Sequence, residues 1–236
     1  GTITWRLGRG PFALPSASGG AAIVATIQAN TAFLGLPLIA VLFSDAELSQ
    51  AVAYDGLVSM PMFVLGSYAV GARLGYAREG GLREQVRVGL LRNPALWTVI
   101  AALLVPEAWA PEWLVTPSHV ALYALLPLGF FVVGVTLGDE AKDGMLRIPP
   151  PLTPPIAVVV LLRMAFVPLV LLVVGLLFID VPASFYVMAA MPVAVNSVLV
   201  GHATGLDLRL ISAAIAWTTV IALAGVLALT LVRALA

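Results

Sequence analysis

The sequence has no cysteine, and only 10% of its 236 residues are charged. The lack of cysteine excludes a disulfide framework, a thiolate metal site and a redox-active dithiol. The scarcity of charge excludes an ordinary soluble domain, in which about 25% of the residues are charged. Because 61% of the residues are hydrophobic, the composition indicates an integral membrane protein whose surroundings are the lipid bilayer.

The chain also lacks the motifs of common enzymes. It has no phosphate-binding loop, no nucleophile elbow and no paired carboxylates. Its two histidines, His119 and His202, are far from any metal-ligand spacing. We therefore expect no enzymatic activity, no cofactor, no metal ion and no nucleic-acid partner.

A hydrophobic run from about residue 19 to residue 43 is long enough to cross a bilayer, since a spanning helix needs roughly 20 residues. Asn30 and Thr31 lie near its middle, and Gly35 and Pro37 follow. Proline removes one helical hydrogen bond, and its ring clashes with the preceding turn. We therefore expect this helix to kink or unwind at Pro37.

A second interrupted span covers residues 185–200, with Pro192, Asn196 and Ser197 in its middle. Interrupted segments at corresponding positions of two halves are typical of transporters built from repeats. Aligning Asp45 with Asp207, the aspartates that follow the two breaks, gives a repeat offset of 162 residues (207 − 45). Aligning Asn30 with Asn196 gives 166 residues (196 − 30). The two alignments differ by about one helical turn.

Hydropathy predicts seven membrane spans, all helical, at residues 19–43, 45–71, 93–106, 120–137, 156–179, 185–200 and 210–231. The corresponding organisation has four parts. They are a polar cytoplasmic lead-in over 1–18, the last two helices of a first repeat over 19–72, an Arg-rich cytoplasmic connector over 73–92, and a complete second repeat over 93–236.

Basic residues concentrate on the cytoplasmic side of membrane proteins. With seven spans, one side of this chain collects nearly all of them: Arg6, Arg9, Arg73, Arg78, Arg83, Arg87, Arg92, Lys142, Arg147 and Arg209. The N-terminus is therefore predicted to be cytoplasmic and the C-terminus outside, in a cell membrane. The preference for arginine over lysine indicates a GC-rich bacterial source.

The odd number of spans predicts a longer protein. The 162-residue offset places the start of the first repeat about seventy residues before Gly1, which is room for three more spans with short loops. The expected whole is ten spans in two inverted five-helix repeats.

Six segments together resemble the auxin efflux carrier family of membrane transporters. They are NTAFLGLP at 30–37, AYD at 53–55, LRNP at 91–94, LLPLGFFVVGVTLG at 125–138, MPVAVNS at 191–197 and ATGLDLRLISAA at 203–214. The resemblance implies a ten-helix carrier of organic anions such as carboxylates, with crossing, broken fourth and ninth helices. It also implies a distant similarity to bile acid sodium symporters, and it suggests a homodimer.

Carried over by position, the family's crossover residues are Asn30, Thr31, Gly35, Pro37, Pro192, Asn196 and Ser197. The sequence departs from the family after Asp55, where the segment GLVSM at 56–60 replaces the expected polar residues. Coupling to a proton or to sodium is therefore left open.

The partial positive charges at the two breaks favour an anionic substrate. The half-helices after the two breaks begin at mid-membrane, and a helix N-terminus carries roughly half a positive charge and free N–H groups. Side chains of Asn30, Thr31, Asn196 and Ser197 can add donors. The alternative is that these side chains only satisfy the broken backbone.

Asp55 and Arg163 are the ionisable residues predicted to lie deep within spans. Such groups are typical of substrate or ion pathways. Asp55 is a candidate for coupling to a proton or cation, and Arg163 is a candidate counter-charge for the substrate. Alternatively, each bonds to neighbouring helices, or Arg163 extends to the cytoplasmic interface.

The sequence thus favours a carrier that works by alternating access around a midplane crossing. A membrane receptor or scaffold that binds an organic anion without transporting it is the alternative. An intramembrane enzyme is a third possibility, for which no pair of nucleophile and base is found.

Overall fold

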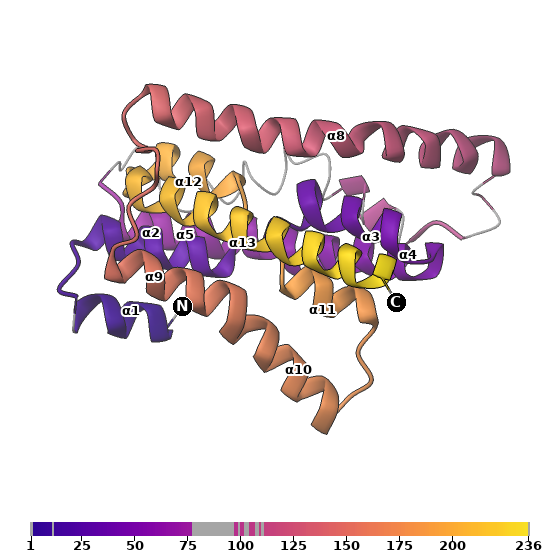
Figure 1. Ribbon diagram of the computed structural model, residues 1–236, viewed down its shortest axis with the longest axis horizontal. Helices are drawn as coiled ribbons and strands as arrows, with labels where there is room; N and C mark the ends of the chain where they lie inside the picture. Colours follow the sequence, from indigo (N-terminus) through magenta and orange to yellow (C-terminus); the bar gives the residue numbers. More distant parts are fainter. Residues whose placement is uncertain are drawn as a thin grey trace.

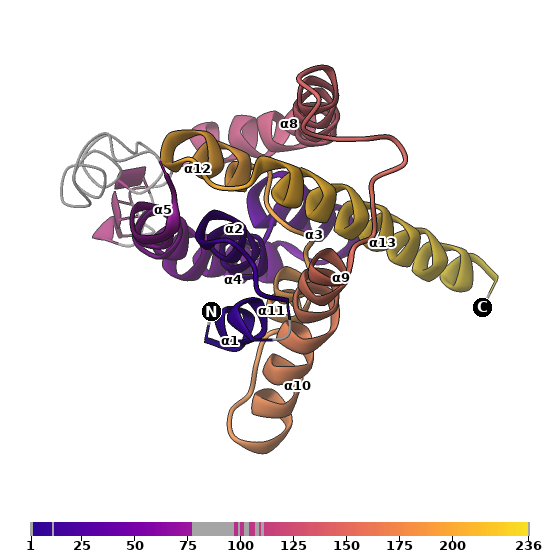
Figure 2. The same cartoon turned by 90° about the vertical axis from the view of Figure 1, so that its left-hand side faces the viewer.

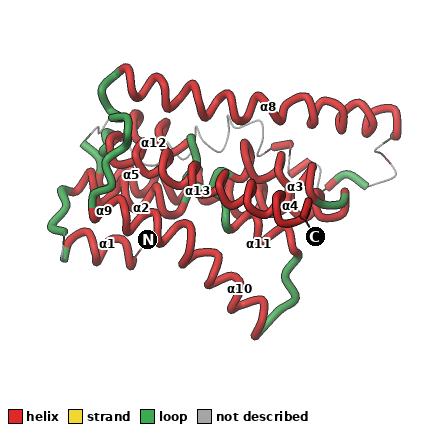
Figure 3. The backbone as a smooth tube through the Cα atoms, viewed as in Figure 1, coloured by secondary structure: helices red, strands yellow, loops and turns green. Residues whose placement is uncertain are grey.

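The computed structural model describes residues 2–10, 12–76, 97–98, 100–101, 104–106, 109 and 111–235. These residues form a bundle of helices (Figure 1), and none of them belongs to a β-strand (Figure 3). Within them, three helical segments are long and apolar enough to cross a membrane: Asp45–Leu74, Pro154–Leu177 and Leu208–Val232. The helical membrane class is confirmed, while the seven spans and the inverted repeat stay predictions.

The predicted lead-in contains the helix α1 (Thr2–Arg9) and the start of α2 (Ser16–Ile27). After α2 the chain leaves helical geometry and then continues as a wide π-helical turn, η1 (Thr31–Gly35), and α3 (Leu36–Leu42). The predicted Arg-rich connector lies outside the described residues from position 77 onward, as does half of the predicted third span.

The kink predicted at Pro37 is wrong, because the break lies at residues 28–30. The side-chain oxygen of Asn30 accepts the N–H of Phe33 at 3.3 Å, so Asn30 caps a new helix. Pro37 lies in the first turn of α3, directly after the π-helical turn. Proline is tolerated at the start of a helix, and a wide turn shifts the hydrogen-bond register around its ring.

The next span is one long helical run. It consists of α4 (Asp45–Tyr54), η2 (Asp55–Ser59), η3 (Met62–Ser67) and α5 (Tyr68–Leu74). The later helices are α8 (Glu112–Lys142), α9 (Pro154–Leu161), η5 (Leu162–Phe166), α10 (Val167–Leu177), α11 (Ala183–Ala189), α12 (Asn196–Thr204) and α13 (Leu208–Leu235). The second predicted break is therefore the stretch between α11 and α12, and Asn196 begins the helix after it.

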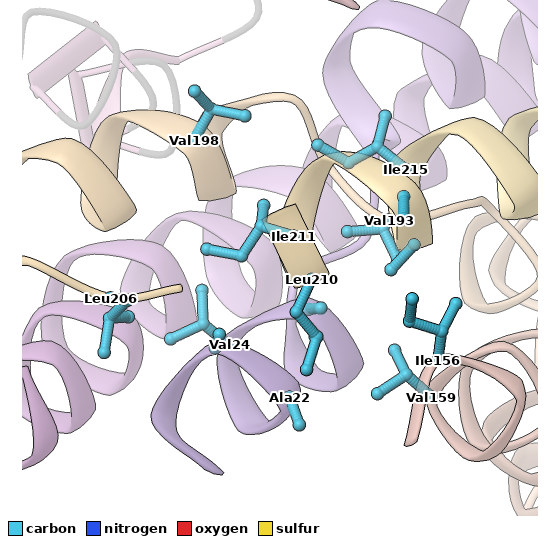
Figure 4. Packing of buried hydrophobic residues seen from close by; sticks show 14 of the residues in the cluster. Ala22, Val24, Ile156, Val159, Val193, Val198, Leu206, Leu210, Ile211 and Ile215 are labelled. Atoms are coloured by element: carbon cyan, nitrogen blue, oxygen red, sulfur yellow. The ribbon is translucent and has the colours of Figure 1, made fainter. Parts of the chain in front are cut away.

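The helix α2 lies in the middle of the bundle and packs against α1, α5, α9 and α13 (Figure 2). Its small residues Ala21, Ala22 and Ala25 are almost fully buried, and small side chains let membrane helices approach closely. Figure 4 shows the resulting core, to which Val24 of α2, Val193 from the second break and Ile211 from α13 all belong. The core thus surrounds the place where both spans are interrupted.

The C-terminal end of α8 is fixed by one buried acid. Glu140 is 4% exposed, and its carboxylate accepts the Ser212 hydroxyl at 3.2 Å and lies 3.0 Å from His202 Nε2. His202 belongs to α12, and Ser212 belongs to α13. One carboxylate therefore joins α8 to both α12 and α13.

Glu140→Gln is expected to lower the free energy of unfolding by about 1 kcal/mol, because hydrogen bonds to a charged group are worth roughly that much more than neutral ones. Asp139→Asn is the matched control. Asp139 is exposed and pairs with Lys142, and an exposed pair contributes less than about 1 kcal/mol. Thermal unfolding of the two purified variants would show the difference; equal effects would mean that the buried contact adds nothing.

Candidate functional site

The two interrupted spans meet at their breaks. The N–H of Asn30 donates to the carbonyl of Pro192 at 2.8 Å, and the N–H of Ala194 donates to the carbonyl of Gln28 at 3.1 Å. Each break supplies hydrogen-bond partners that the other lost when its helix stopped. Non-helical backbone survives at membrane depth only where protein or a water-filled cavity satisfies it in this way.

Ala29 and Val193 face each other in this crossing as an isolated antiparallel bridge. A third element supports them, because the N–H of Val193 donates to the Thr218 hydroxyl of α13 at 3.0 Å. That hydroxyl in turn donates to the carbonyl of Ala214 at 2.7 Å. The crossing is therefore fixed by backbone groups and by one side chain from the long C-terminal helix.

Arg163 of η5 binds the other side of the second break. Its Nε donates to the carbonyl of Met191 at 2.9 Å and its Nη2 to the carbonyl of Ala189 at 2.7 Å. The last carbonyls of a helix lack partners, and the negative end of the helix dipole favours a cation. Because the side chain is only 3% exposed, the interpretation that it extends to the interface is wrong, and it bonds to a neighbouring helix instead.

Four of the predicted site residues line one small cavity beside the crossing: Asn30, Thr31, Asp55 and Asn196. The Thr31 hydroxyl donates to a carboxylate oxygen of Asp55 at 2.5 Å. The side-chain nitrogen of Asn30 is buried and has no hydrogen-bond partner within the described part of the chain. The cavity has a volume of about 20 Å³, which is room for roughly one water molecule.

The other predicted crossover residues do not line this cavity. Gly35 packs against Met188, whose sulfur would lie 2.6 Å from an added Cβ. Pro37 is buried in α3, and Pro192 contributes its carbonyl to the crossing. The Ser197 hydroxyl is buried and is unpaired among the described residues.

The comparisons with known proteins bear on this geometry. The chain is 26% identical over 146 residues to an uncharacterized transporter of Methanocaldococcus jannaschii; the match covers 60% of this chain and 46% of that protein. The chain is similar to a transporter. It spans about half the length of this curated relative. No family model matches the chain, and no solved structure matches it.

This likeness and the apolar helices support a membrane protein with a role in transport in general terms. The relative's name, an uncharacterized transporter, gives no substrate. The auxin efflux carrier family in particular stays a prediction that rests on the six segments quoted above.

A larger cavity lies next to the small one. Its volume is about 450 Å³, within the range of roughly 300–1,000 Å³ that is typical of ligand sites. Its polar lining includes Arg163, Tyr54, Thr26 and Ser59. Ala29 and Ser59 line both cavities, so the two cavities adjoin.

Three polar residues at the crossing were not among the predicted site residues. The Gln28 side-chain amide donates to the Ser67 hydroxyl at 2.7 Å, and both are buried. Gln28 could have been chosen, because a polar amide inside an apolar run is unusual. Thr218 offers no such signal, since threonine is common in apolar helices and only its distant partner gives it a role.

Proposed function

We propose that this chain belongs to a secondary carrier, active or facilitative, that moves small organic anions, carboxylates first, across the cell membrane. The observation that carries the proposal is the crossing of two interrupted spans, joined by the Asn30–Pro192 and Gln28–Ala194 backbone bonds. Discontinuous helices that meet in this way are typical of secondary transporters, whose substrate sites lie beside the unwound backbone.

Two contacts between the ends of the halves support an inverted repeat. The Ser18 hydroxyl at the start of α2 donates to the Asp207 carboxylate at 2.7 Å. The backbone N–H of Ser184 at the start of α11 donates to the Glu47 carboxylate at 2.9 Å. The two serines are 166 residues apart (184 − 18), which is also the offset of the two asparagines. Each interrupted helix therefore begins against an acid of the other half.

In this proposal the polar side chains at the crossing serve transport directly. Asn30, Thr31 and Asn196 bind the substrate or its coupling ion, and Asp55 carries the coupling proton or sodium ion through its contact with Thr31. A receptor that binds the anion without transporting it is the alternative, and a homodimer remains part of the proposal on the family resemblance alone.

Asn196→Ala is expected to reduce carboxylate uptake into sealed vesicles by about tenfold, as expected for the loss of one hydrogen bond of roughly 1.4 kcal/mol to the substrate or its coupling ion. Leu199→Ala is the control, because Leu199 lies on the same helix and is exposed. Uptake would be measured with labelled mono- and dicarboxylates at several pH values, with and without sodium. Binding of an anion without uptake would instead establish the receptor.

A further inference from the structure

The long helix α8 contacts both interrupted spans at two separate places. It lies along one side of the bundle (Figure 1). At Gly129 it packs so closely against η1 that an added Cβ would lie 2.4 Å from the Phe33 carbonyl oxygen. Glu140 lies eleven residues later (140 − 129), about 16 Å further along the helix, and contacts His202 of α12 and Ser212 of α13. The helix α8 therefore links the two interrupted spans in addition to their crossing.

Among the described residues, a single hydrogen bond joins α12 to α8. The helix α12 packs against α2, α5, η3 and α13, whereas its link to α8 is His202 Nε2, 3.0 Å from a carboxylate oxygen of Glu140. Glu140 is 4% exposed, and its other carboxylate oxygen accepts the Ser212 hydroxyl. Alternating access requires one group of helices to move against another. A movement of α12 relative to α8 would have to break the contact between Glu140 and His202.

The helix α12 connects this contact to the candidate site. It begins at Asn196, which lines the small cavity beside the crossing. His202 lies six residues later (202 − 196), or about 9 Å along the same helix. Backbone hydrogen bonds keep a helix straight over this distance. A restraint on His202 therefore also restrains Asn196.

The contact joins an exposed imidazole to a buried carboxylate. The His202 side chain is 54% exposed, so its ring can exchange a proton with water. The helices α2 and η3 carry no titratable side chain. The other charged or titratable groups on the elements around α12 and at the adjoining end of α8 are Tyr68, Arg73, Tyr76, Asp139, Lys142, Asp143, Arg147, Asp207 and Arg209. In the described part of the chain none of them forms an ion pair with His202. The proton on His202 therefore acts mainly on Glu140.

The strength of the contact depends on the charge of the imidazole. A neutral imidazole has one donor nitrogen and one acceptor nitrogen, whereas both nitrogens of an imidazolium donate. The hydrogen bond from an imidazolium to a carboxylate is charge-assisted and roughly twice as strong as a neutral one. Histidine gains its proton as the pH falls from about 8 to about 5. Over this range acidification therefore strengthens the link between α8 and α12.

We infer that the Glu140–His202 contact is a pH-sensitive restraint on the carrier. When His202 is protonated, α12 is held against α8 and the movement of the crossing is slow. When the ring is neutral, the restraint weakens and the movement is faster. The inference rests on the proposed function, because transport is the process that the contact restrains. It is separate from the proposed coupling at Asp55, since His202 does not line the small cavity.

The first test is a double-mutant cycle on the unfolding temperature, which needs no substrate. The wild type, His202→Gln, Glu140→Gln and the double variant are compared at about pH 5.5 and about pH 8, near the two ends of the range in which histidine titrates. The cycle separates the interaction between the two side chains from the effect of each substitution alone. The interaction is expected to raise the unfolding temperature by about 2 °C more at the lower pH, for a chain of this length. An interaction of equal size at both pH values would overturn the inference.

The second test measures the uptake of labelled carboxylates into sealed vesicles with the same pH on both sides. At about pH 5.5, His202→Gln and Glu140→Gln should each take up substrate about threefold faster than the wild type, as expected from the loss of a partly exposed ion pair. At about pH 8 the difference should be small. His202→Lys keeps a positive charge at both pH values, so its uptake should also stay slow at about pH 8.

His119→Gln is the matched control, because His119 is the other histidine of the chain and lies in α8, 21 residues before Glu140 (140 − 119). It should respond to pH as the wild type does. If His202→Gln and Glu140→Gln also respond as the wild type does while the vesicles take up carboxylates, the inference is wrong and the carrier stands. If no variant and no wild-type protein moves a carboxylate at either pH, the proposed function is wrong and the inference fails with it.

Discussion

Thr218→Val is expected to lower the free energy of unfolding by about 1–3 kcal/mol, the cost of leaving one buried backbone donor without a partner. The substitution removes the Thr218 hydroxyl, which accepts a hydrogen bond from the Val193 N–H at 3.0 Å in the middle of the second break. No water reaches this group, because Val193 and Thr218 are both fully buried. The substitution keeps the shape of the side chain, so packing is little changed.

Thr219→Val is the control for this experiment. The Thr219 hydroxyl is buried too, but it has no hydrogen-bond partner in the described part of the chain. Removing an unpaired buried hydroxyl should leave stability unchanged or raise it. Thermal unfolding of both variants in the same detergent gives the comparison. Equal losses would show that α13 does not support the crossing through Thr218.

The second large effect is expected from Gly129→Ala on α8. A Cβ at this position would lie 2.4 Å from the carbonyl oxygen of Phe33 in η1. The added Cβ and the Phe33 carbonyl oxygen are both fixed to the backbone and cannot rotate away. Therefore α8 would have to move away from the first interrupted span. Such overpacking typically costs about 1–3 kcal/mol.

Gly134→Ala on the same helix should behave in the opposite way. Nothing lies within 4 Å of the added methyl group at position 134, and alanine is better than glycine in a helix by up to about 1 kcal/mol. Unfolding temperatures of the two variants are therefore expected to change in opposite directions. A stabilised Gly129→Ala protein would mean that α8 and η1 are not in close contact.

The location of the crossing could be predicted because its signals are local. Asn30 and Asn196 are polar residues inside long apolar runs, and each lies where a new helix begins. The position of the first break could not be predicted from Pro37, since a π-helical turn just before it accommodates the ring. Proline predicts a disturbance of the helix, but the cap at Asn30 decides where the helix stops.

The surroundings of the charged residues could not be predicted, because they depend on contacts far apart in the sequence. Arg163 binds carbonyls 26 and 28 residues away, and carbonyls are present at every position of a sequence. The difference between a water-sized cavity and a much larger one arises from side-chain packing on several helices at once. Hydropathy and motif spacing contain no information on either.

The Ala29–Val193 bridge has a consequence for inheritance. Its bonds join main-chain groups, which every amino acid except proline possesses in full. Substitutions of the side chains along both segments can therefore accumulate over evolution while the joint persists. The exception is proline at position 30 or 194, because proline lacks the N–H group that Asn30 and Ala194 donate. Homologous proteins could retain this joint after most of their residues have changed. Their relationship would then be recognised by comparing backbone structures.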